Sequence, residues 1–155
     1  MPSTPAVRLE LIRSAAIDCG FNRSVAITRE KYDMGPFKDG WTEQDVEDVI
    51  LRGDPEVLLY VPIVVSMDPP DPGWSQDICL RLVDHDHWNV RGNAILGFGH
   101  LARTTRKLDK DRVLPLVANA LNDPNEYVRG HAHDAVADIS HYLGWTFPSS
   151  KPSTE

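Results

Sequence analysis

The chain has 155 residues, of which 41% are hydrophobic and 25% are charged, and its formal net charge is −7. This length and composition are typical of one soluble globular domain with a core of ordinary size. No apolar stretch approaches the roughly 18 residues that cross a bilayer, so we expect no membrane-spanning segment.

The acidity lies in the C-terminal three-quarters of the chain. Residues 41–155 hold ten Lys/Arg against eighteen Asp/Glu, which gives −8. An acidic surface repels the phosphates of nucleic acids and attracts basic proteins, so we expect a basic protein as partner, with no nucleic acid or membrane. The acidity could equally serve solubility alone. Cys19 and Cys79 have no framework spacing, which indicates a reducing, cytoplasmic compartment.

The N-terminal part is the least regular. A short helix over 8–19 is compatible with its pattern, and we expect residues 1–41 to cap the helical array that follows. Residues 42–52 are amphipathic, and Thr42 and Gly53 are typical N-cap and stop residues.

Prolines punctuate the next segment. Asp54-Pro55 predicts the start of another helix, which Pro62 should bend or end because proline lacks a backbone donor. Residues 42–67 are therefore interpreted as a degenerate helical hairpin. The prolines and glycine of 68–73 predict a rigid spacer after it.

A clear repeat follows. The segment 90–94, Val-Arg-Gly-Asn-Ala, returns as Val-Arg-Gly-His-Ala at 128–132, an offset of 128 − 90 = 38. The two copies, 75–104 and 109–144, each predict two helices joined by a tight turn. Gly97 and Gly99 fall inside a predicted helix, where close helix packing explains them.

The helix bounds follow from capping signals and apolar spacing. In the first copy they are 76–83, after Ser75 as N-cap, and 88–102. In the second copy the helices are 111–121 and a segment that Asp123-Pro124 starts and Gly144 ends. The tail 147–155 is rich in Ser and Pro, so we expect it to be disordered.

This pattern of Leu, Asp, Val-Arg and Ala at a helix-turn-helix period near 40 resembles the HEAT repeat family. The resemblance implies an all-α fold, a short right-handed α-solenoid of antiparallel helical hairpins, with about three repeats over 42–146 and an N-terminal cap. It also implies that Asp123, Arg91 and Arg129 are structural, linking neighbouring repeats, and that the second helices of the hairpins line a concave wall.

One face of the last helix is the candidate site. His131, Asp134, Asp138 and His141 follow spacings of three, four and three, so they form one stripe. The equivalent positions 38 residues earlier include Asn93 and His100. The HEAT resemblance implies that this stripe faces a groove, which Trp88 and Tyr142 would share and at whose edge Glu126 would lie. The candidate partner-binding residues are then Trp88, Asn93, His100, Glu126, His131, Asp134, Asp138, His141 and Tyr142.

Three interpretations of this stripe stay open. The first is a surface that binds a basic protein. The second is a metal site formed by His131, Asp134, Asp138 and His100, since histidine and carboxylate ligate zinc or iron. HEAT proteins that bind iron use repeated His-Glu dipeptides, whereas this chain has only His133-Asp134. The third is a solvated helix face without a specific role.

No sequence motif of a nucleophilic, phosphate-binding or zinc-dependent enzyme is present. We therefore expect a non-enzymatic adaptor or inhibitor that needs no cofactor. A narrower hypothesis is a bacterial immunity protein that neutralises a basic toxin. The alternative is a metal-dependent enzyme that uses the histidine–aspartate stripe. The sequence does not determine the oligomeric state.

Overall fold

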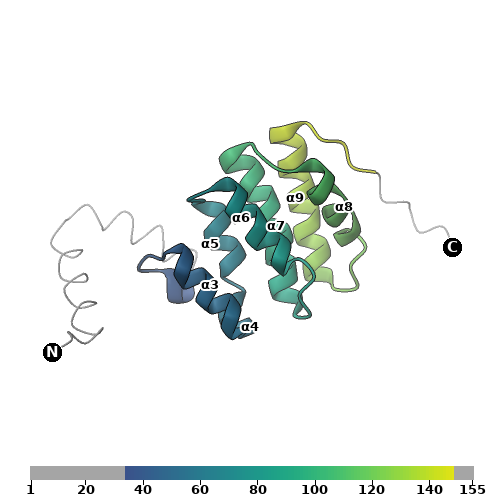
Figure 1. Ribbon diagram of the computed structural model, residues 1–155. Coiled ribbons are helices and arrows are strands. Elements are labelled where there is room, and N and C mark those ends of the chain that lie inside the picture. Colours follow the sequence, from purple (N-terminus) through teal and green to yellow (C-terminus); the bar gives the residue numbers. More distant parts are fainter. Residues whose placement is uncertain (1–33, 149–155) are drawn as a thin grey trace, which may run out of the picture. The chain divides into compact units, whose positions relative to one another are not determined.

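The computed structural model describes residues 34–148. The expectations for 8–19, for the N-terminal cap up to residue 33, for Cys19 and for the tail beyond 148 lie outside the described residues. Within 34–148 the secondary structure is helical, with no strand (Figure 1). The chain divides into two units, 1–39 and 40–155. The described part of the first unit contains a single turn of 3₁₀ helix, η1 (Gly35–Phe37).

The second unit begins with α3 (Glu43–Arg52), which starts and stops where the sequence predicts. Thr42 forms a capping box with Asp45: the Asp45 amide donates to the Thr42 hydroxyl at 3.2 Å, and the Thr42 amide donates to the Asp45 carboxylate at 2.7 Å. Gly53 ends the helix in the left-handed region, at φ 70°, a conformation that favours glycine.

Pro62 interrupts the next helical segment, as predicted. The segment divides into α4 (Pro55–Leu58), capped by Asp54, and α5 (Val61–Met67). Pro62 lies in the first turn of α5, where its missing N–H would have no intrahelical partner.

The four remaining helices have matching bounds. α6 (Pro72–Leu82) and α8 (Lys110–Ala120) have 11 residues each, and their starts differ by 110 − 72 = 38. α7 (Trp88–Thr105) and α9 (Glu126–Leu143) have 18 residues each, and their starts differ by 126 − 88 = 38. The 38-residue offset seen in the sequence therefore applies to whole helices.

Two predicted helix starts are wrong. The first is that of α6: the Asp71 carboxylate accepts the Trp74 amide at 3.0 Å and caps the helix, whereas Ser75 lies buried inside it. The predicted spacer 68–73 is accordingly shorter, because Pro72 and Gly73 belong to the first helical turn. The second is that of α9, where Asn125 is the N-cap. The Asp123 carboxylate binds Arg91 instead.

Helix α7 occupies the centre of the second unit. It packs against α5 and α9 on either side, and against α6 and α8 (Figure 1). Glycines permit the closest approaches. A Cβ on Gly97 would meet the Cys79 Sγ at 2.7 Å, and one on Gly99 would meet the Ala135 Cα at 3.0 Å. The close packing expected for these two glycines is confirmed.

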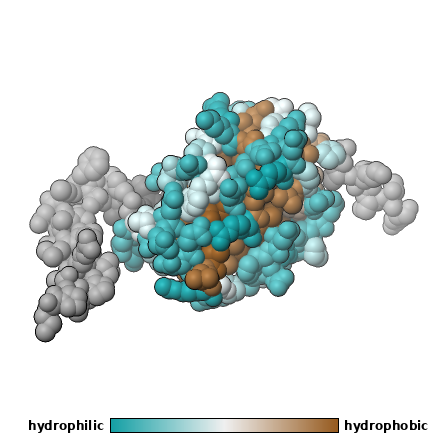
Figure 2. Space-filling model, in the orientation of Figure 1, coloured by the Kyte–Doolittle hydropathy of each residue, from teal (hydrophilic) through white to brown (hydrophobic). Residues whose placement is uncertain are grey.

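The core of the second unit consists of aliphatic side chains together with Phe98 and Cys79. Phe98, Ile95 and Leu101 of α7 are at most 1% exposed, and Ile78 of α6 and Ile139 of α9 pack from neighbouring helices. On the face shown in Figure 2, apolar residues form a broken band between hydrophilic areas. Among the residues described, no helix has the length and apolar character needed to cross a membrane.

Candidate interaction face

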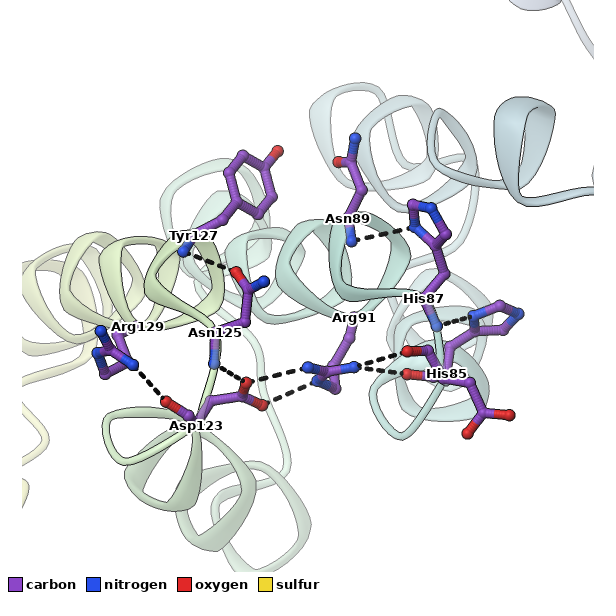
Figure 3. A network of polar contacts seen from close by, with 9 residues as sticks. His85, His87, Asn89, Arg91, Asp123, Asn125, Tyr127 and Arg129 are labelled. Atoms are coloured by element: carbon purple, nitrogen blue, oxygen red, sulfur yellow. Dashed lines mark hydrogen bonds and ion pairs between the residues drawn. The ribbon is translucent and has the colours of Figure 1, made fainter.

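One ion pair joins the first helical turn of α7 to the loop before α9. Arg91 Nε and Nη2 donate to the two carboxylate oxygens of Asp123 at 2.8 and 3.0 Å, a bidentate geometry (Figure 3). Arg91 Nη1 donates to the carbonyl oxygens of His85 and Asp86 at 3.0 and 3.1 Å. The Arg91 and Asp123 side chains are only 19% and 12% exposed. The hydrogen bond from Arg91 therefore lowers the pKa of Asp123 below its ordinary value.

The same turn contacts recur 38 residues later. Arg129 Nη1 donates to the carbonyl oxygen of Asp123 at 2.7 Å, as Arg91 Nη1 donates to that of His85, and 123 − 85 = 38. The placement of Arg91, Arg129 and Asp123 at these turns is consistent with the structural role that the HEAT resemblance implies for them.

The turn before α7 is held by histidine rings (Figure 3). The His87 amide donates to His85 Nδ1 at 3.0 Å, and the Asn89 amide donates to His87 Nδ1 at 3.3 Å. In the turn before α9, the Asn125 and Tyr127 amides donate at 2.9 and 2.8 Å to the residues two positions earlier. In both His85 and His87, Nδ1 therefore acts as a hydrogen-bond acceptor for a backbone amide of the turn.

Four rings then form a continuous aromatic cluster, defined by His87, Trp88, Tyr127 and His131. The centroids of His87 and Trp88 are 5.5 Å apart and nearly parallel, whereas Trp88–Tyr127 and Tyr127–His131 make edge contacts at 4.9 and 4.2 Å. Trp88 and Tyr127 remain 41% and 37% exposed. The cluster therefore offers two large aromatic side chains to solvent.

The Tyr127 side chain is held in place by contacts with α7. Its hydroxyl donates to Asn93 Oδ1 at 2.6 Å, and Asn93 Nδ2 donates to the Leu59 carbonyl oxygen at 2.8 Å. A Cβ on Gly92 would meet Tyr127 Cδ1 at 2.8 Å, so the ring lies directly on the backbone of α7. Asn93 is only 5% exposed, so it supports the Tyr127 ring and offers little of its own surface to a partner.

Two histidines, His131 of the cluster and His100, have pKa values below the ordinary value. Ser66 Oγ donates to the Pro62 carbonyl oxygen at 2.6 Å, so we assign His100 Nδ1–H as the donor to Ser66 Oγ at 3.2 Å. Burial lowers the pKa of His100 to about 4. Burial also lowers the pKa of His131, although Asp134, 3.9 Å from its Nδ1, partly opposes that shift.

The predicted stripe divides into two parts along α9. His131 belongs to the aromatic cluster and Asp134 lies beside it, whereas the rings of His141 and Tyr142 pair with each other at 4.7 Å near the other end of the helix. The separation of 142 − 131 = 11 positions corresponds to about 16 Å along the helix axis. Arg106 lies over the Tyr142 ring, 5.1 Å from its centroid, so this second group has different neighbours.

Two further candidate residues lie at the margins of this face. Glu126 is exposed at the first position of α9. A Cβ on Gly99 would lie 3.4 Å from the Asp138 carboxylate, which places Asp138 against α7.

The residues of the metal alternative do not form a metal site. Within residues 34–148, no three His, Cys, Asp or Glu side chains are close enough to hold an ion. His131 and Asp134 approach each other, but His100 Nδ1 is bonded to Ser66. The arrangement observed is one of aromatic rings and neutral histidines beside an exposed carboxylate, which suits recognition of a cation.

The sequence-based choice of residues omitted Tyr127, the centre of the aromatic cluster. A signal for it existed, since 131 − 127 = 4 places Tyr127 on the same helical row as His131. Comparison of the chain with protein-family models, curated proteins and solved structures found no match.

Proposed function

We propose that this protein is a HEAT-like interaction module that binds a basic segment of another protein through the aromatic cluster and Asp134. A short right-handed α-solenoid is the architecture we infer for it. Its support is the common 38-residue offset in helix bounds, arginine contacts and turn hydrogen bonds. Helices α3 to α5 then form a degenerate first repeat.

The observation that carries the proposal is the exposure of Trp88 and Tyr127 in a rigid setting. Tyr and Trp dominate the binding energy of many interfaces because each buries a large area and loses few rotamers. Here the contacts between the rings, and the hydrogen bond from Tyr127 to Asn93, hold both side chains in place. Little conformational entropy is therefore lost when a partner covers them.

The charges nearby favour a cationic partner. The Asp134 side chain is 70% exposed, and Glu126 is exposed on the same helix. The faces of Trp and Tyr attract Lys and Arg, at about 0.5–2 kcal/mol per contact. His131 and His100 have lowered pKa values, so at neutral pH they add no positive charge that would repel such a partner.

A narrower form of the proposal is an inhibitor that neutralises a basic toxin in the cytoplasm, as an immunity protein does. The net charge of −7 supports it, because complementary charge accelerates the encounter of two proteins. The toxin would then place a Lys or Arg side chain against Trp88.

The test is quantitative affinity purification from the native host with wild-type protein and three variants. The site variants are Trp88→Ala and Asp134→Lys/Asp138→Lys. The matched control is Arg112→Ala, because Arg112 is an exposed α8 residue that pairs with Asp77. We expect a basic protein that the wild type and the control retain, that both site variants lose, and that high salt releases.

The purified partner then gives the magnitudes. Trp88→Ala should weaken binding by about 2 kcal/mol, roughly 30-fold, as for an aromatic anchor. The double aspartate variant should mainly slow association and reduce its salt dependence. Capture that is unaffected by both site variants would refute this face as the binding surface.

A further inference from the structure

Arg129 repeats the setting of Arg91 but without its carboxylate. Both arginines use Nη1 to bind a carbonyl oxygen in the turn before their own helix, at 2.7 Å for Arg129 and 3.0 Å for Arg91. Arg91 Nε and Nη2 then bind Asp123, whereas Arg129 Nε and Nη2 contact no acceptor among residues 34–148. Figure 3 shows both guanidinium groups at the turns. The Arg129 guanidinium is therefore oriented, with its bidentate edge open.

A matching carboxylate lies in the first hairpin. Asp54 precedes a proline in the turn between α3 and α4, as Asp123 precedes one in the turn between α8 and α9. The Asp54 Oδ1 accepts the Glu56 amide at 3.1 Å, as the Asp123 Oδ1 accepts the Asn125 amide at 2.9 Å. Asp54 is exposed, and its Oδ2 contacts no donor within the described part of the chain.

These two groups belong to different ends of the row of hairpins. The hairpin α6–α7 lies between α3–α5 and α8–α9, since α7 packs against α5 on one side and α9 on the other (Figure 1). Asp54 lies in the first hairpin and Arg129 in the last. Next to Asp54, Leu51 at the end of α3 is 87% exposed. An apolar side chain and an available carboxylate are therefore neighbours in sequence at the first hairpin.

We propose that a second copy of this chain docks head to tail, with Asp54 of one copy bound bidentately by Arg129 of the next. The contact would reproduce between copies the pair that Arg91 and Asp123 form within one copy. Each added copy leaves one free Asp54 and one free Arg129, so the product is an open series of oligomers. This site is separate from the aromatic cluster, so it does not depend on the proposed function.

On the α9 side of the contact, two positions that are apolar in α7 are polar, which gives the ion pair more weight. His133 and Ser140 of α9 occupy the positions equivalent to the buried Ile95 and Ala102 of α7, since 133 − 95 and 140 − 102 both equal 38. His133 is exposed and Ser140 is half-buried. We therefore expect weak association that salt reverses, because exposed ion pairs are screened within about 10 Å at 0.1 M salt.

The test is sedimentation velocity on the full chain from about 10 μM to 1 mM, at low salt and at about 0.5 M salt. The wild type should form larger species as concentration rises at low salt, and less so at high salt. Arg129→Gln and Asp54→Asn should each remain monomeric. Asn at position 54 retains the oxygen that caps the Glu56 amide, so the fold of the turn is kept.

Mixing the two variants gives the sharpest result. Asp54→Asn supplies an intact Arg129 and Arg129→Gln supplies an intact Asp54, so an equimolar mixture should form a 1:1 dimer and nothing larger. Arg112→Ala removes a different exposed guanidinium, so this variant should associate as the wild type does. A wild type that stays monomeric throughout, or association that persists in either single variant, would refute the proposal. If Arg129→Gln fails to fold, Arg129→Lys replaces it, because lysine keeps the charge without the bidentate fork.

Discussion

Gly92 and Gly130 hold the same position in two copies of one pattern, but their surroundings differ. A Cβ on Gly92 would lie 2.8 Å from Tyr127 Cδ1, whereas one on Gly130 would meet nothing within 4 Å. Both glycines lie within α-helices. Packing therefore requires glycine at position 92, whereas position 130 has room for a side chain.

We predict stability changes of opposite sign for these two sites. Gly130→Ala should raise the free energy of unfolding by about 0.5–1 kcal/mol, because alanine loses less backbone entropy in a helix. Gly92→Ala should lower it by about 1–3 kcal/mol, because the methyl group displaces the Tyr127 ring. Urea denaturation of both variants measures the two effects, and a gain at Gly92 would contradict the packing described here.

The lowered pKa of His100 predicts that stability depends on pH. Its pKa falls from 6.5 to about 4 on folding, so the unfolded chain takes up a proton first as pH decreases. The stabilising contribution of the neutral ring is fully present above about pH 6.5 and is lost as pH falls through 4, a loss on the order of 3 kcal/mol. His100→Asn, which can still donate to Ser66 but does not titrate, should flatten the stability profile between pH 4 and 6.5. An unchanged profile would show that another group is responsible.

At the scale of elements, the repeat made most helix bounds predictable. The predicted 111–121 agrees within one residue with α8 at each end, and the predicted 88–102 lies within α7, with the same start. The two errors at helix starts have one physical cause. Ser75 and Asp123 are both good capping residues, but each has a second good capping residue nearby, Asp71 and Asn125, and a sequence does not show which of the two will cap the helix.

The site was predictable only in part, for a related reason. The helical period placed His131 and Asp134 among the candidates, and the HEAT resemblance added Trp88. The structure brings Trp88 and His131 into one cluster with Asp134 beside it. The sequence pattern could not show that Asn93 is buried beneath Tyr127, because that depends on the distance between two helices. Gly92 permits the close contact with Tyr127. From the sequence alone, a glycine at this position does not indicate which side chain packs against it.

The link between α7 and the turn before α9 predicts a strong effect at Asp123. Asp123→Asn keeps the oxygen that accepts the Asn125 amide but removes the charge opposite Arg91, so stability at pH 7 should fall by about 2–3 kcal/mol. Asp77→Asn is the matched control, since the Asp77–Arg112 pair is more than half exposed and should matter by less than about 0.5 kcal/mol.

The Arg91–Asp123 ion pair also determines how the stability difference between wild type and Asp123→Asn varies with pH. Because folding lowers the pKa of Asp123, its contribution is present above the unfolded value of about 3.9 and is lost as pH falls through the folded value. The gap between wild type and Asp123→Asn should therefore narrow below about pH 4. Equal gaps at pH 3 and pH 7 would contradict an ionic contact.

At the scale of the whole molecule, stability should be greatest along α7. This helix packs against α5, α6, α8 and α9, and Val90, Ala94 and Phe98 are fully buried along it. α3 has fewer neighbours, and its Leu51 is almost fully exposed.

Hydrogen exchange in the native state should reflect this order. We expect the amides of α7 to exchange only through global unfolding, and those of α3 to exchange faster through local opening. Mass spectrometry after proteolysis resolves the two helices. Equal protection in α3 and α7 would mean that α3 is stabilised by contacts beyond those among residues 34–148.

The position of Trp88 also makes the candidate face visible to spectroscopy. Its indole is partly in water and touches Tyr127 and His87, so any molecule that covers it changes the polarity around the chromophore. The chain has three other tryptophans, Trp41, Trp74 and Trp145. With those replaced by phenylalanine, the emission wavelength would come from this face alone. The protein thus contains its own optical probe for partner binding, without an attached dye.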